Sequence, residues 1–155
     1  MFKRILVPLD GSQLAEKALP YAEALAKKFE AELILVQVLQ LMPEFVGGTH
    51  GGVMFHEQIG QDRQVAEAYL NGLMRQVYEL GIRPIRTVTL EAHSVATAIA
   101  QLACDESVEL IVMSTHGRSG LSRLVHGSVA GQMLHEAPCP VFLVKVAESD
   151  CQENS

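Results

Sequence analysis

Short, dense apolar runs alternate with stretches of helical periodicity along almost the whole chain, and this alternation constrains the fold more than any other feature. A strand buried on both faces of a sheet is a continuous apolar run, whereas a covering helix carries apolar residues every three or four positions. The alternation therefore favours an α/β domain with a parallel sheet covered on both faces. The expected strands are residues 3–9, 31–39, 82–90, 108–115 and 139–146.

Helical spacing is found in the segments between these runs. A helix is expected over residues 14–29, with a local bend at Pro20 because proline removes one backbone hydrogen bond. Further helices are expected over 94–104 and from about Ser128 to Glu136. Another begins near Gln61 and ends at Gly81, and its inward-facing residues are expected to be Val65, Ala68, Leu73, Val77 and Leu80.

The order of elements predicts the topology of the sheet. Right-handed crossovers leave few arrangements for five parallel strands, and the flavodoxin-like order 3-2-1-4-5 is the natural one. We expect a single-domain, Rossmann-like three-layer sandwich over residues 1–147, followed by a polar tail over 148–155. Residues 40–60 lose periodicity and contain the glycine-rich stretch GGTHGG, so a loop is expected there.

Composition excludes several classes of protein. The net charge is −6, which gives no reason to expect nucleic acid as a partner. The apolar runs are far shorter than a membrane span, and the first residues lack the apolar core of a signal peptide. The three cysteines are widely spread without a CxxC pair, which indicates neither a zinc site nor a disulfide framework. A reducing cytoplasm is the simplest location.

Polar, glycine-bearing segments follow two of the expected strands. Asp10, Gly11 and Ser12 follow the first, and STHGRSGLSRLVHGS, residues 114–128, ends the fourth. In open parallel sheets, ligands bind beyond the carboxyl ends of the strands where the strand order reverses, so these segments should be neighbours. Glycines beside a helix start suit a phosphate group. The alternative, that the glycines only turn the chain and a serine only caps the helix, stays open.

Three stretches of the chain resemble the universal stress protein family: ILVPLDGS, LIVMSTHGRSGLSRLVHGSVA and APCPVFLVKV. The likeness covers nearly the whole chain except residues 40–60 and the tail. The nucleotide-binding branch of the family has the pattern G-x2-G-x9-G-[ST]. Gly117, nine residues, Gly127 and Ser128 match its second part, but Ser114 stands at the first glycine. If that position needs a positive φ, serine costs about 1 kcal/mol or more.

This resemblance implies that the chain binds ATP between strands 1 and 4, helped by Mg²⁺ or Mn²⁺. It implies that the backbone of Val38 meets the adenine edge. Asp10 would accept hydrogen bonds from ribose hydroxyls or hold a cation through water; its alternative role is to cap the first helix. No catalytic residue and no metal ligand set is expected. The nucleotide contacts implied are Pro8, Leu9, Asp10, Val38, Ser114, Thr115, His116, Gly117, Arg118, Ser119, Gly120, Gly127, Ser128, Val129 and Ala130.

The expected function is that of an ATP-binding regulatory module of the stress response, which acts through dimerisation and through an unidentified protein partner. Two alternatives stay open: a nucleotide-independent scaffold and a slow ATP hydrolase. The chain lacks the GK[ST] ending of a Walker A loop, so at most weak ATPase activity is expected.

The last expected strand, PVFLVKV at residues 140–146, is apolar on both faces and would form one edge of the sheet. A bare apolar edge invites pairing with another chain. Two-fold pairing with a second copy is the simplest way to cover it, and the family resemblance implies the same homodimer.

Overall fold

The computed structural model describes residues 1–41, 51–116 and 129–146. Strands and helices alternate through them. The strands are β1 (Arg4–Leu9), β2 (Glu32–Gln40), β3 (Ile85–Ala92), β4 (Leu110–His116) and β5 (Val141–Val146). The helices are α1 (Gln13–Glu16), α2 (Leu19–Phe29), α3 (Gly51–Glu79), α4 (Val95–Asp105) and α5 (Val129–Glu136).

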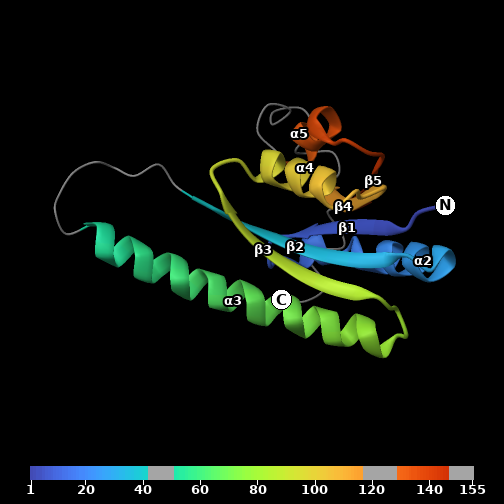
Figure 1. The fold of residues 1–155 in the computed structure, drawn as a ribbon, viewed down its shortest axis with the longest axis horizontal. Coiled ribbons are helices and arrows are strands. Elements are labelled where there is room, and N and C mark those ends of the chain that lie inside the picture. Colours follow the sequence, from blue (N-terminus) through green and yellow to red (C-terminus); the bar gives the residue numbers. More distant parts are fainter. Residues whose placement is uncertain (42–50, 117–128, 147–155) are drawn as a thin grey trace.

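The strands form one parallel sheet in the order β3-β2-β1-β4-β5, which confirms the predicted topology. Helices α2 and α3 lie against one face, and α4 and α5 lie side by side against the other (Figure 1). The molecule is therefore the expected three-layer sandwich. The strand order reverses between β1 and β4, and this point is where ligands bind in open parallel sheets.

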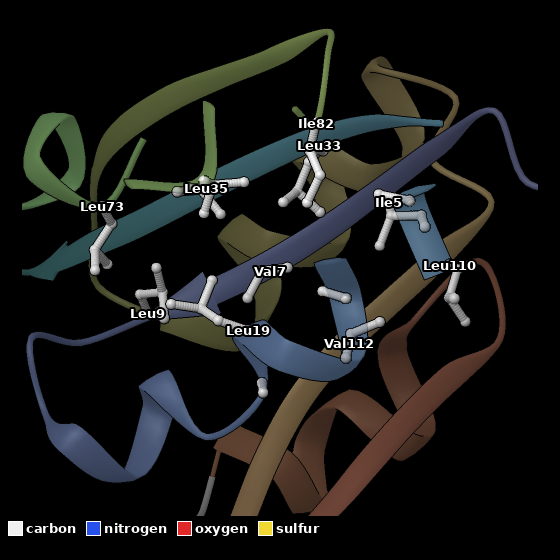
Figure 2. Packing of buried hydrophobic residues seen from close by; sticks show 14 of the residues in the cluster. Ile5, Val7, Leu9, Leu19, Leu33, Leu35, Leu73, Ile82, Leu110 and Val112 are labelled. Atoms are coloured by element: carbon white, nitrogen blue, oxygen red, sulfur yellow. The ribbon is translucent and has the colours of Figure 1, made fainter. Parts of the chain in front are cut away.

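Alternation along β1 shows why its sequence is a continuous apolar run. Ile5 and Val7 pack in the core beneath α2 and α3, whereas Leu6 packs in the core beneath α4 and α5. All three are fully buried. Figure 2 shows the first of these cores, where side chains of β1 and β2 meet Leu19 of α2 and Leu73 of α3. A central strand covered on both faces leaves no position for a polar side chain.

The first predicted helix is wrong in one respect, because it is two helices. α1 ends at Glu16, and α2 begins at Leu19 with Pro20 in its first two positions. A proline in the first turn of a helix breaks no hydrogen bond, since those N–H groups have no partner within the helix. Pro20 therefore marks the start of a new helix rather than a bend within one.

Helix α3 begins at Gly51, ten residues before the predicted start at Gln61. The prediction of a loop over residues 40–60 is therefore wrong for residues 51–60, and residues 42–50 lie outside the described part. The N-terminal half of α3 extends past the end of the sheet (Figure 1). A helix segment without a sheet to cover needs no apolar stripe, which explains why periodicity did not reveal it.

The buried face of α3 also differs from the prediction. Leu73 and Val77 are buried as expected, but Val65 is 70% exposed and Leu80 is 57% exposed. Ala68 is exposed as well. The buried stripe is Ala66, Leu70, Leu73 and Val77. The predicted and observed faces share Leu73 and Val77 and differ within the run VAEAYL, where Leu70 packs fully buried in the core and Val65 points away from it.

Charged side chains pair at the amino-terminal edge of the sheet. Arg86 of β3 contacts Glu32 of β2 at 2.9 Å and Glu106 at 2.7 Å, and Arg4 of β1 contacts Glu32 at 3.3 Å. These contacts tie three strands together at the edge opposite to the strand ends where a ligand is expected. In the described part of the chain, no helix has the length and apolar content needed to cross a membrane.

Candidate functional site

Pro8 opens the sheet at the point where the strand order reverses. The carbonyl of Arg4 accepts a hydrogen bond from Glu109 N at 3.1 Å, so the backbone N–H and C=O groups of Arg4 face β4. Alternation of the backbone gives Leu6 and Pro8 the same direction. Pro8 has no N–H to donate, and the pairing of β1 with β4 ends at Leu6 and Ile111. Beyond this pair β1 and β4 are no longer paired residue by residue, which leaves room between their carboxyl ends.

A cavity of about 260 Å³ lies at this place. We call it the switch-point cavity. It brings together eight of the residues predicted from the sequence: Pro8, Leu9, Asp10, Val38, Ser114, Thr115, Val129 and Ala130. The sequence prediction missed six further residues that line it: Leu14, Ala15, Val36, Val95, Ile99 and Met113.

The missed residues are apolar, and most of them follow from alternation once the register is known. Val36 lies two positions before Val38 on the same face of β2, and Val95 and Ile99 lie one turn apart on α4. No pattern in the sequence predicts that the first turns of α4 and α5 lie close to the same strand ends. That proximity results from the packing of α4 against α5 on one face of the sheet.

Other predicted contacts cannot be placed. His116 ends β4, and its side chain lies outside the described part of the structure. The same holds for Gly117, Arg118, Ser119, Gly120, Gly127 and Ser128, which are outside the described residues altogether.

Asp10 holds the turn that follows β1. Its Oδ1 accepts hydrogen bonds from Ser12 N at 2.9 Å and from Ser12 Oγ at 2.5 Å. Ser12 is the N-cap of α1, and its Oγ accepts a hydrogen bond from Ala15 N at 3.1 Å. The helix cap is therefore Ser12, and Asp10 orients the cap rather than replacing it. Oδ2 of Asp10 has no hydrogen-bond partner among the described residues, and the side chain is exposed at the cavity.

Ser114 adopts its position without backbone strain. It lies within β4, and it is not among the described residues with a positive φ. Its Oγ donates a hydrogen bond of 2.7 Å to the carbonyl of Leu14 in α1. Ser114, at the position where the pattern G-x2-G-x9-G-[ST] has its first glycine, therefore fastens α1 to the end of β4, and α1 supplies Leu14 and Ala15 to the cavity wall.

A second hydrogen bond holds α1 from its other side. Tyr69 of α3 donates from its hydroxyl to Glu16 Oε1 at 2.9 Å. Burial raises the pKa of Tyr69, and the hydrogen bond to Glu16 raises it further, so the phenol stays protonated and remains a donor. A helix of a single turn is marginal by itself. Ser114 and Tyr69 together hold this one as a fixed wall of the cavity.

The arrangement suits a flat apolar ring with polar substituents at its rim. Aliphatic side chains from β1, β2, β4 and α4 form the walls, and Asp10, Ser114 and Thr115 lie where the strands end. Helix α5 begins at Val129 beside the same space, and the N–H groups of a helix start favour an anion. Among the described residues, no group of three His, Cys, Asp or Glu side chains could hold a metal ion.

Comparisons with known proteins agree on one family. The model of the universal stress protein family matches residues 1–145. A universal stress protein of Methanocaldococcus jannaschii is 35% identical over 147 residues, which are 94% of this chain and 83% of the relative. Universal stress protein UspA from Lactobacillus plantarum has a TM-score of 0.78 at 21% identity, over 92% of this chain and 97% of that one. A universal stress protein in complex with cAMP has a TM-score of 0.65 at 18% identity, over 93% and 97%.

Proposed function

The chain belongs to the universal stress protein family, and from this premise we propose that it is an ATP-binding regulatory module of the stress response. In this proposal the switch-point cavity takes the adenine nucleoside. The nucleotide alters how the protein assembles and which protein partner it binds. The observation that carries the proposal is an apolar cavity with a polar rim at the reversal point of the strand order.

The walls and the rim of the cavity suit the two ends of an adenine nucleoside. An adenine ring needs apolar surfaces on both faces, which Val36, Val38 and Ile99 offer. Ribose hydroxyls donate hydrogen bonds and need acceptors. Oδ2 of Asp10 can accept them, because it has no hydrogen-bond partner among the described residues. The complex of a structurally similar universal stress protein with cAMP supports an adenine nucleotide as the class of ligand.

Phosphate groups would extend from the cavity toward the start of α5 at Val129. Mg²⁺ or Mn²⁺ would enter with the triphosphate, because a divalent cation bridges phosphate oxygens and needs few protein ligands. Asp10 is the carboxylate that lines this space, and it would hold the hydrated ion through water. The proposal does not require hydrolysis, which would be slow without a P-loop lysine.

We propose further that the protein is a homodimer paired through β5. This strand is one edge of the sheet. Phe142 on it is 41% exposed and packs on Tyr21 of α2, itself 50% exposed, with ring centroids 5.8 Å apart. An apolar strand edge flanked by exposed aromatic rings is a surface that a second copy could cover.

Calorimetric titration of the purified chain with ATP tests the proposed ligand. We expect a dissociation constant in the micromolar range or below, tightened by Mg²⁺ or Mn²⁺. At one hundred times that constant, binding adds about 2.7 kcal/mol to the free energy of unfolding, which raises Tm by roughly 5–10 °C. Absence of heat and of a thermal shift at millimolar ATP would favour the nucleotide-independent scaffold. Mass spectrometry of small molecules released from the protein provides an independent check.

A further inference from the structure

Two cysteines that are far apart in the sequence lie on the same side of the sheet. Cys104 is in the last turn of α4 and is exposed, whereas Cys139 lies in the segment that joins α5 to β5 and is partly buried. Both are free thiols. Neither of them lines the switch-point cavity, so the proposed nucleotide function does not use them.

The side chain of Cys139 lies on the face of the sheet that α4 and α5 cover. It packs against the core beneath these two helices, as do Val141 and Leu143, which follow it at alternate positions along the chain. The same core contains Ala103, the neighbour of Cys104 in α4. Cys139 therefore lies under the layer of helices to which Cys104 belongs.

Backbone hydrogen bonds bring the two segments to one corner of the molecule. After α4, Val108 N donates to the carbonyl of Ala103 at 2.8 Å, so the chain passes close to the end of the helix before β4 begins. Ile111 N in β4 donates to the carbonyl of Pro140 at 3.0 Å, which places the residue after Cys139 beside the start of β4. The last turn of α4 and the segment before β5 thus flank the same end of β4.

The helical position of Cys104 turns it toward this segment. Thr97 lies two turns earlier on the same side of α4. Its Oγ1 donates to Glu136 Oε2, in the last residue of α5, at 3.0 Å. This side of α4 therefore faces α5, and shortly after Glu136 the chain reaches Cys139.

Electrostatics shows that the two sulfur atoms are neighbours. Burial raises the pKa of the Cys139 thiol, and the negative charge of a Cys104 thiolate raises this pKa further. At neutral pH Cys139 is therefore protonated, and a protonated thiol is a poor nucleophile. Cys104 is the more exposed of the two, so a dissolved oxidant reaches it first.

We propose that Cys104 and Cys139 form a redox-sensitive modification site, in which hydrogen peroxide joins the two thiols in an intramolecular disulfide. The sulfur of Cys104 attacks one oxygen of the peroxide, the O–O bond breaks, and the other oxygen leaves as water with the thiol proton. The product is a sulfenic acid. The sulfur of Cys139 then attacks the sulfur of Cys104, the S–S bond forms, and the S–O bond breaks. The hydroxyl group leaves as a second water with the proton of Cys139.

This site is compatible with the wide spacing of the cysteines, which indicates no structural disulfide framework. The proposed bond forms only when the oxidant is present, and a reducing compartment reopens it. When closed, it connects the last turn of α4 to the segment before β5. The inference does not depend on nucleotide binding.

Peptide mass spectrometry of the full chain tests the pairing. The reduced native protein is treated with sub-millimolar hydrogen peroxide, and the remaining thiols are then alkylated. We expect a peptide that links Cys104 to Cys139, parallel loss of alkylation at both thiols, and reversal by dithiothreitol. Links to Cys151, in the tail outside the described residues, should be minor. In concentrated urea the preference should change to Cys139 and Cys151, which are closer along the chain.

Matched variants identify the two partners. Cys151→Ser should keep the link, because its thiol is not part of the pair. Adding Cys104→Ser to Cys151→Ser should leave Cys139 open to alkylation after peroxide treatment. The proposal is overturned if both thiols of the native protein remain open to alkylation. It is also overturned if Cys104 oxidises to a sulfinic acid while Cys139 is still alkylated, or if native and urea-unfolded protein form the same pairs.

Discussion

Ala130→Phe is expected to lower the affinity for ATP by on the order of 100-fold or more, because the benzyl group would occupy the part of the switch-point cavity that the nucleotide needs beside the start of α5. Ala130 lies in the first turn of α5, is only 9% exposed and lines the switch-point cavity. A larger side chain in a packed core would strain the fold, but here it can enter a cavity of about 260 Å³. Calorimetry gives the affinity, and circular dichroism with thermal melting shows whether the domain is folded.

The matched control is Ala24→Phe, which makes the same change at an exposed position of α2. This variant should bind ATP like the unmodified protein. Ala130→Phe that is folded and binds ATP with unchanged affinity would place the nucleotide outside the switch-point cavity.

Leu143→Pro is expected to convert a homodimer into a folded monomer. Ile111 N donates to the carbonyl of Pro140 at 3.0 Å, so the backbone carbonyl of Pro140 faces β4. Alternation then directs the backbone N–H of Leu143 to the open edge of the sheet. Proline at this position removes a donor from the proposed pairing with a second β5 and removes none from the pairing with β4. Light scattering coupled to size exclusion at micromolar concentration measures the change.

The control for this substitution is Thr89→Pro in β3, the other edge of the sheet. Leu33 N donates to the carbonyl of Pro84 at 2.9 Å, and the same alternation directs Thr89 N–H away from β2. Thr89→Pro should remain dimeric. A dimer that survives Leu143→Pro, or an unmodified protein that is monomeric, contradicts pairing through β5. A lysine at Val144 would be a poor test, because that side chain is 6% exposed and its loss would damage the core.

Much of this fold could be predicted from the chain alone, because a strand buried on both faces of a parallel sheet is a short, continuous apolar run. The dense runs around Leu6, Ile34 and Ile111 correspond to strands buried on both faces. The reversal point between β1 and β4 follows from the strand order, and with it the location of the cavity. Eight predicted contacts line that cavity because they all lie at strand ends or at the start of a helix.

Other features depend on contacts between distant residues, and local patterns do not contain them. The role of Ser114 depends on the carbonyl of Leu14, one hundred positions away. The buried stripe of α3 is decided by where Leu70 meets the sheet, not by periodicity within the helix. A second cavity, of about 230 Å³, is lined by Gln40, His93 and Gln132 from three separate segments, and each of them by itself is an ordinary surface residue.

The central claim is that an adenine nucleotide binds between the carboxyl ends of β1 and β4, and amide chemical shifts test it most directly. Addition of ATP with Mg²⁺ to ¹⁵N-labelled protein should move the amide signals of Asp10, Val38, Thr115 and Ala130, which line the cavity. Signals of Glu32 and Glu106 at the amino-terminal edge should remain in place. Unchanged spectra at millimolar ATP, or shifts confined to that opposite edge, would contradict the claim.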